Sequence, residues 1–210
     1  MKHWDTVAIV GVGLIGGSIG RDLLARGIAR RVIGIGRRQT SLKAARQIGA
    51  VTETTLKLAA GVAEADLVVV CTPVGRIVDD VRAAAVACKT GAVVTDAGST
   101  KGRIVREIAA QELPSGVAFV GSHPLAGSEK SGPSAAVENL FRERTVVVTP
   151  TDATPTGALR AVETFWKQLG ARVVRMSPED HDLALAATSH VPHVVAAALA
   201  GTTPENYLTL

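Results

Sequence analysis

VAIVGVGLIGGS, residues Val7–Ser18, is the stretch that decides the fold of this chain. An apolar run typical of a buried strand ends at Gly11, and the periodicity of an amphipathic helix begins near Leu14. Gly11, Gly13 and Gly16 have the spacing Gly-x-Gly-x-x-Gly. This context of strand, glycine-rich turn and helix predicts a dinucleotide-binding βαβ unit, with a merely tight structural turn as the alternative.

The glycines and the start of the helix each have a part in such a site. Gly11 permits the tight turn, Gly13 lets a pyrophosphate approach the backbone, and Gly16 lets the helix lie close to the strand. Leu14 and Ile15 place free N–H groups and the positive end of the helix dipole beside the phosphates. We therefore expect all five residues to bind the cofactor.

Strand and helix patterns alternate along the rest of the chain. The expected strands are Thr6–Val10, Arg31–Gly36, Val51–Glu53, Asp66–Cys71, Ala92–Asp96, Ala118–Gly121, Thr145–Thr149 and Arg172–Arg175. The expected helices are Leu14–Arg26, Ser41–Ile48, Leu56–Ala63, Pro73–Cys88, Thr100–Gln111, Thr156–Leu169 and Pro178–Ala200. This alternation predicts an α/β fold of the Rossmann type, with a doubly wound, mainly parallel sheet and ligands at the carboxyl ends of its strands.

The end of the second strand bears on the choice between NAD and NADP. An acidic residue there would bind the ribose 2′-hydroxyl, but the sequence has Gly36, Arg37 and Arg38. The two arginines slightly favour a 2′-phosphate, unless they are only solvated surface charge. Thr72 and Pro73 follow the fourth strand, and we expect them to border the same cofactor, NAD or NADP.

Polar residues also follow the fifth and sixth strands. Ser99 or Thr100 is expected to cap the next helix, which leaves the other hydroxyl free to face the nicotinamide side of the crevice. His123, after the sixth strand, lies at the edge of the same crevice. Its imidazole can accept a proton or a hydrogen bond near neutral pH, the alternative being a loop histidine that bonds its own turn.

A third group of candidate site residues lies in the helical pattern that begins at Pro178. His190, which follows Ser189, and His193 stand at i and i+3 on one helix face. A substrate-facing pair is the preferred interpretation, and satisfied core histidines are the alternative. No metal site is expected, because His181 is nine residues from His190 and no third ligand has a suitable spacing.

Composition narrows the class of protein. Of 210 residues, 47% are hydrophobic and only 3% aromatic, so we expect an aliphatic core. The net charge is +4 without a run of basic residues, which favours anionic small molecules over nucleic acid as ligands.

Cys71 and Cys88 are expected to be reduced core thiols. Neither a signal peptide nor a membrane span is visible, so we expect a cytoplasmic protein.

Four stretches of the chain resemble the prephenate/arogenate dehydrogenases of tyrosine biosynthesis. They are Gly11–Gly17, Asp96–Lys101, Gly121–Gly132 and Thr188–His193, and they span almost the whole chain. The resemblance implies NAD(P)-dependent oxidative decarboxylation of a small-molecule substrate, prephenate or arogenate, with hydride transfer to the nicotinamide.

The resemblance also implies roles for five residues. His123 would be the catalytic histidine that hydrogen-bonds the ring hydroxyl of the substrate. Ser99 would bind the same hydroxyl and help to place the nicotinamide. Ser189, His190 and His193 would line the substrate pocket from a second domain.

That second domain is all-helical in the family, where it dimerises and supplies an arginine to a substrate carboxylate. Only its first helix is present here, so residues 1–176 are expected to form the dinucleotide-binding domain and residues 177–210 the start of the helical one. We expect weak turnover, and a homodimer or larger assembly formed through the apolar face of this helix. That face is expected to include Leu183, Leu185, Val194, Val195 and Leu199.

Two other functions remain open. Another dehydrogenase of the 6-phosphogluconate-like superfamily would share the glycine motif. Those enzymes usually rely on a lysine in the helical domain, and the Ser122-His123-Pro124 motif argues against them. A non-catalytic NAD(P)-binding remnant is the third possibility, supported by the early end of the chain.

Overall fold

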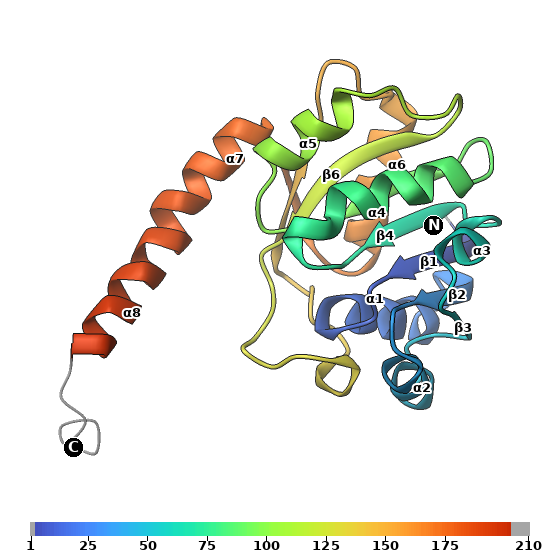
Figure 1. Cartoon of the computed structure of the whole chain (residues 1–210), viewed down its shortest axis with the longest axis horizontal. Coiled ribbons are helices and arrows are strands. Elements are labelled where there is room, and N and C mark those ends of the chain that lie inside the picture. The colour runs from blue at the N-terminus through green and yellow to red at the C-terminus, as the bar shows by residue number, and fades with distance from the viewer. Residues whose placement is uncertain (1–2, 203–210) are drawn as a thin grey trace.

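Eight strands form one sheet in the computed structural model, which describes residues 3–202 (Figure 1). Their order is β3-β2-β1-β4-β5-β6-β7-β8. The strands are β1 (Trp4–Val10), β2 (Ala29–Ile35), β3 (Glu53–Thr55), β4 (Leu67–Val70), β5 (Val93–Asp96), β6 (Ala118–Pro124), β7 (Thr145–Thr149) and β8 (Arg172–Arg175). Every neighbouring pair is parallel except β6 and β7. The predicted Rossmann-type fold is therefore confirmed.

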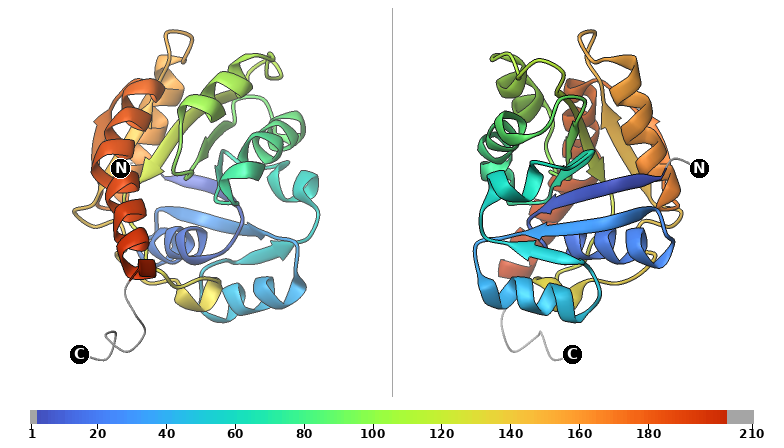
Figure 2. Two further views of the ribbon diagram at one scale, coloured as in Figure 1. Left: turned by 60° about the vertical axis from the view of Figure 1, so that its left-hand side comes forward. Right: turned by 90° about the vertical axis from the view of Figure 1, so that its right-hand side faces the viewer.

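Helices cover both faces of the sheet (Figure 2). They are α1 (Leu14–Ala25), α2 (Gln39–Gln47), α3 (Leu58–Val62), α4 (Val74–Ala87), α5 (Gly102–Ala109) and α6 (Thr156–Gln168). Helices α1, α2 and α6 contribute buried residues to the core on one face, and α3, α4 and α5 to the core on the other. Strand β4 between the two cores is fully buried, which explains its uninterrupted Leu-Val-Val-Val sequence.

The core is mainly aliphatic, with one aromatic cluster that the composition did not predict. Phe141, Phe165 and Trp166 are fully buried. Trp166 meets each phenyl ring edge to face, at centroid distances of 5.3 and 5.0 Å. Cys71 and Cys88 are free thiols, but each is only partly buried.

Strand β6 extends farther than predicted, and this changes the setting of His123. We expected the strand to end at Gly121, with His123 on the following loop. Instead β6 pairs with β5 through Val120 and then with the antiparallel β7, where His123 lies opposite Val147. The second ladder extends the strand to Pro124, so the sheet itself holds the histidine backbone.

A long helical segment follows β8 and extends away from the sheet (Figure 1). It consists of α7 (Pro178–Leu185), a π-helical turn (Ala186–His190) and α8 (Val191–Thr202). The Ser177 side chain caps its start by accepting a hydrogen bond from the Asp180 amide at 3.0 Å. The expected helix, Pro178–Ala200, is therefore confirmed and continues to Thr202, and residues 203–210 lie outside the described part of the chain.

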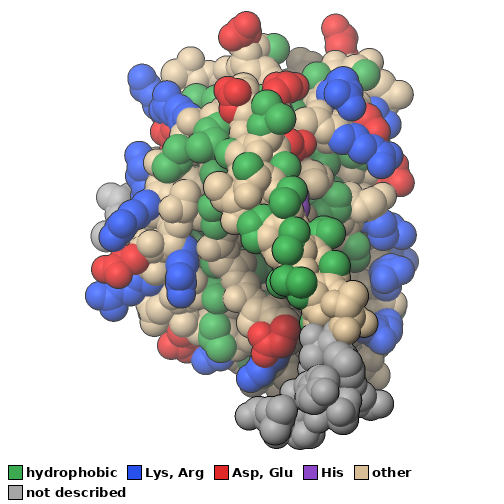
Figure 3. Space-filling view, turned by 90° about the vertical axis from the view of Figure 1, so that its left-hand side faces the viewer, with side chains coloured by type: hydrophobic (Ala, Val, Ile, Leu, Met, Phe, Trp, Pro, Cys, Tyr) green, Lys and Arg blue, Asp and Glu red, His purple; other side chains and the backbone are tan. Residues whose placement is uncertain are grey.

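The apolar face of this segment is largely exposed (Figure 3). Leu183, Val194, Val195 and Leu199 are between 50% and 71% exposed, as expected. Leu185 was expected among them but is buried at 8% exposure, because α7 packs against the domain. Within residues 3–202, Pro178–Thr202 is also the one helix long and apolar enough to cross a membrane, judged by length and composition alone. Its centre nevertheless carries polar side chains, at Thr188, Ser189 and His190.

Candidate active site

The glycine-rich turn has the geometry that its sequence predicts. Gly11 has φ +94°, a left-handed conformation that suits glycine, and a Cβ there would lie 2.8 Å from the Cys71 carbonyl oxygen. A Cβ on Gly16 would lie 2.3 Å from the Gly11 carbonyl oxygen, so α1 can approach β1 only with glycine at this position. A Cβ on Gly13 would meet no heavy atom within 4 Å, which leaves that side of the turn open.

A cavity of about 400 Å³ adjoins this turn, at the carboxyl ends of β1, β2 and β4. Six of the residues expected to bind the cofactor line it, namely Gly11, Gly13, Arg37, Arg38, Thr72 and Pro73. Leu14, Ile15 and Gly16 form the first turn of α1 behind it and do not line it. Sequence reasoning missed Ser41 on α2 and Arg76 and Asp80 on α4, which also line the cavity.

The lining of this cavity fits a dinucleotide. The Thr72 hydroxyl is buried and has no hydrogen-bond partner among residues 3–202, as expected of a group that a ligand satisfies. Arg37 and Arg38 are exposed at the rim, and within residues 3–202 neither forms an ion pair with a carboxylate. Their charges are therefore available to a phosphate.

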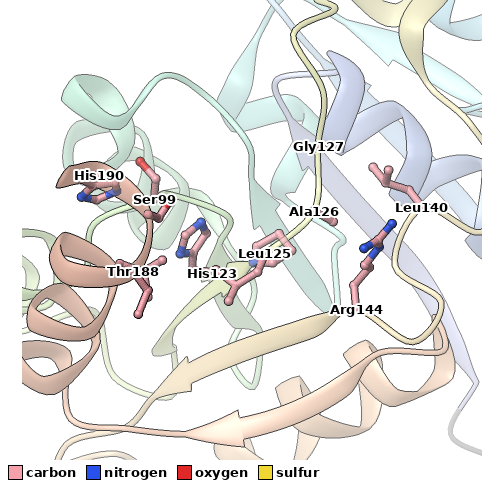
Figure 4. Close-up of a pocket in the computed structure, with 12 residues that line it drawn as sticks. Ser99, His123, Leu125, Ala126, Gly127, Leu140, Arg144, Thr188 and His190 are labelled. Carbon is pink, nitrogen blue, oxygen red and sulfur yellow. The ribbon is translucent and has the colours of Figure 1, made fainter. Parts of the chain in front are cut away.

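A second cavity, of about 570 Å³, lies beyond the ends of β5 and β6 (Figure 4). It brings together four of the five residues expected to contact substrate, Ser99, His123, Ser189 and His190. His193 does not line it and is exposed on α8. The other lining residues are Pro124, Leu125, Ala126, Gly127, Leu140, Arg144, Leu185 and Thr188.

Ser99 lies on a loop that a buried ion pair holds in place. Asp96 and Lys101 form this pair, and both side chains are fully buried. The Asp96 carboxylate also accepts a hydrogen bond from the Gly98 amide at 2.9 Å. Ser99 itself is exposed, and its side chain has no hydrogen bond to any residue of the described range 3–202. Its hydroxyl is therefore free for a ligand.

The helix cap predicted for this loop is wrong. Neither Ser99 nor Thr100 caps α5. The Asp182 carboxylate takes that place from α7, accepting hydrogen bonds from the Lys101 amide at 2.7 Å and the Gly102 amide at 2.9 Å. A capping residue 80 positions away along the chain has no local sequence signal.

His123 is the titratable group at the centre of the second cavity. Burial lowers the pKa of its imidazole to about 3, and the neighbouring His181, Lys101 and His190 add to the effect, while Asp182 opposes it. The free imidazole is therefore neutral at physiological pH and can accept a hydrogen bond. Its Nδ1 lies 2.9 Å from Nε2 of His181, which is fully buried.

Sequence reasoning missed two contributions to this cavity. His181 was considered only as a metal ligand, although the adjacent pair His181-Asp182 was a visible signal. Arg144, just before β7, is the only Lys or Arg among the residues of the range 3–202 that line the cavity. Across residues 3–202, no three His, Cys, Asp or Glu side chains are grouped so as to hold a metal ion.

The Rossmann-type sheet and its two cavities define a nucleotide-binding domain with a reaction site at the same edge of the sheet. The family model for the nucleotide-binding domain of prephenate dehydrogenase matches residues 19–175. The model for the dimerization domain of prephenate dehydrogenase matches residues 177–208. The chain belongs to the prephenate dehydrogenase family.

Individual relatives agree with this assignment. Prephenate dehydrogenase of Bacillus subtilis is 39% identical over 93% of this chain and 53% of its own length. Cyclohexadienyl dehydrogenase of Zymomonas mobilis is 36% identical over 96% of this chain and 68% of its own length. The chain thus spans about half to two thirds of these curated relatives.

A solved structure supports the same conclusion. Prephenate dehydrogenase from Aquifex aeolicus, in complex with hydroxyphenyl propionate and NAD⁺, has a TM-score of 0.86 and 34% identity to this chain. The similarity covers 96% of this chain and 71% of that one.

Proposed function

We propose that this chain carries the cofactor site and the catalytic histidine of a prephenate or arogenate dehydrogenase, which oxidatively decarboxylates its substrate. The observation that carries the proposal is the position of neutral His123 and free Ser99 in one cavity, at the sheet edge that also bears the dinucleotide cavity. The NAD⁺ in the Aquifex relative and the nucleotide-binding family model support NAD or NADP as the cofactor.

When bound, the nicotinamide would supply the hydride acceptor for C4 of the substrate, while the ring carboxylate would depart as CO₂ and the ring would become aromatic. His123 accepts a hydrogen bond from the C4 hydroxyl and so stabilises the positive character that develops at C4. Such assistance typically contributes 10²–10⁴-fold to the rate. Ser99 orients the same hydroxyl, and Ser189 and His190 close the cavity from the helical segment.

Arg144 supplies a positive charge for an anionic substrate. Prephenate carries two carboxylates, and burial of an unpaired carboxylate is costly. The family resemblance assigns one of these carboxylates to an arginine of the helical domain. Arg144 at the cavity wall is available for one of the two carboxylates.

The exposed apolar face of α7 and α8 supports a homodimer or larger assembly formed through this segment, in keeping with its match to a dimerization domain. That match also favours a protein partner over a bilayer as the neighbour of this face. We therefore propose a cytoplasmic enzyme that acts on a small molecule, with neither a membrane nor a nucleic acid as partner.

The test is an assay of nicotinamide reduction with prephenate and with arogenate, each with NAD⁺ and NADP⁺, together with detection of CO₂ and the phenolic product. We expect one of the two substrates to reduce the nicotinamide and release one CO₂ per hydride. Cofactor binding without reduction by either substrate would instead support the non-catalytic remnant.

A further inference from the structure

Three side chains form a continuous hydrogen-bonded chain behind the second cavity. The Asp182 Oδ1 lies 2.8 Å from His181 Nδ1, and His181 Nε2 lies 2.9 Å from His123 Nδ1. The two imidazole rings meet edge to face, with centroids 5.1 Å apart and an interplanar angle of 71°. His123 is the only one of the three that reaches the cavity, so the other two act through it.

The direction of each hydrogen bond follows from the chemistry of its groups. An ionised carboxylate only accepts, so His181 Nδ1 carries a proton and donates to Asp182. With a single proton on His181, its remaining nitrogen is an acceptor, so His181 Nε2 accepts from His123 Nδ1. His123 then has its proton on Nδ1, and its Nε2 keeps a free lone pair for a ligand in the cavity.

Other contacts hold the Asp182 end of this chain in place. The carboxylate also accepts from the Lys101 and Gly102 amides at the start of α5, directly after the loop that carries Ser99. Burial opposes the ionisation of Asp182, but these amides and His181 outweigh it and lower its pKa. Asp182 is therefore an anion anchored to the same loop that presents the Ser99 hydroxyl.

We propose that His181 and Asp182 are positioning residues that hold His123 as the Nδ1–H tautomer, with Nε2 as the acceptor for the substrate hydroxyl. The same division of labour, in which a carboxylate orients an imidazole through its far nitrogen, occurs in hydrolytic triads. The proposal rests on the proposed function for the identity of the hydroxyl, but the tautomer itself does not depend on it.

This assignment also gives α7 a chemical role. Both positioning residues lie in α7, within the segment that matches the dimerization-domain model. The reaction site is therefore complete only when this helix is docked on the nucleotide-binding domain. The competing explanation is purely structural, with Asp182 as the cap of α5 and His181 as a packed core residue.

The tautomer can be measured without any activity, by two-bond ¹H–¹⁵N correlation spectra of the 210-residue chain labelled at histidine nitrogens. We expect a protonated Nδ1 and an unprotonated Nε2 on both His123 and His181 near neutral pH. A proton on Nε2 of His123 would overturn the proposal, as would a doubly protonated His181.

Substitutions distinguish a positioning role of His181 and Asp182 from a role in the stability of α7. His181→Asn and Asp182→Asn should each release His123 from the fixed tautomer and lower kcat by about tenfold or more, a part of the 10²–10⁴-fold that such a histidine contributes. The Kd for the cofactor should not change, because its cavity is lined by other residues. The matched control is Ser177→Ala, which removes the cap of the same helix but touches none of the three groups.

The outcomes are distinguishable. A lowered kcat in Ser177→Ala equal to that in the other two variants would show that only the stability of α7 matters and would overturn the proposal. If one variant fails to fold, the tautomer measured in the other and in the parent chain decides the question. The predicted tautomer in a chain that never reduces the nicotinamide would leave the arrangement intact and reject the proposed function instead.

Discussion

At the scale of single residues, we expect Arg37 and Arg38 to decide the cofactor preference. Both are exposed at the rim of the dinucleotide cavity, without a carboxylate partner in the described chain. We expect the chain to bind NADP⁺ at least as well as NAD⁺. Arg37→Ala or Arg38→Ala should weaken NADP⁺ binding by about 1.5–3 kcal/mol, the usual value of a hydrogen bond to a charged group, and leave NAD⁺ binding unchanged.

Isothermal titration with both cofactors measures this effect. Arg172→Ala is a suitable control, because Arg172 is exposed on β8 and lies outside both cavities. Much tighter binding of NAD⁺ by the parent, with no effect of either arginine on NADP⁺, would contradict the expectation.

The lowered pKa of His123 predicts that the stability of the fold depends on pH. Its pKa in the folded chain, about 3, is below the ordinary value of about 6.5 that it regains on unfolding. The unfolded chain therefore binds more protons between these values, so stability is complete above pH 6.5 and falls as the pH falls. The slope from this one group is at most about 1.4 kcal/mol per pH unit.

Urea denaturation between pH 6.5 and 5 measures how the free energy of unfolding changes with pH. In this range most carboxylates remain ionised. His123→Asn should flatten the dependence of the unfolding free energy on pH. Equal slopes in the parent and His123→Asn would show that His123 does not remain neutral in the folded chain.

The residue scale is also where sequence reasoning succeeded and failed most clearly. The steric roles of Gly11 and Gly16 were predictable, because they depend on the local backbone of the strand–turn–helix unit. The link from Asp182 through His181 to His123 was not, because it joins α7 to β6 across 58 residues. The cap on α5 failed for the same reason, since a distant carboxylate replaced the nearby hydroxyls.

At the scale of elements, the helical segment α7–α8 has an apolar face that is largely exposed. Leu183, Val194 and Leu199 are each more than 60% exposed. A contiguous patch of this kind favours association. We therefore expect sedimentation to show a dimer or larger assembly, and Val194→Glu to shift it toward the monomer.

Val86→Glu is the matched control, because Val86 is 76% exposed on α4, away from this segment. The same shift in both variants would point to general charge repulsion. A parent chain that sediments as a monomer at all concentrations would contradict the expectation.

Elements were predictable where the hydrophobic period was strong. The bounds of β7 and β8 agree with the sequence, and α1 and α6 agree to within one residue. The short β3 was displaced by two residues, to Glu53–Thr55, because a three-residue strand has little periodic signal. The end of β6 depended on its pairing with β7, which no local pattern reveals.

At the scale of the whole molecule, the alternation of strands and helices was sufficient to predict the sheet, since parallel strands require crossover helices. The position of the expected sites at one edge of the sheet was also predictable, because the carboxyl ends of parallel strands lie there. The docking of α7 onto this edge was not predictable, because it depends on side-chain contacts between segments far apart in sequence.

We propose that His123 is the catalytic histidine of a nicotinamide-dependent dehydrogenase. The most direct test compares single-turnover nicotinamide reduction by the parent chain and His123→Asn, with cofactor and prephenate or arogenate both saturating. Asparagine retains hydrogen bonding but loses the basic nitrogen, so we predict a rate lower by about 10²–10⁴-fold with an unchanged cofactor Kd. Equal rates in the two proteins would contradict the claim.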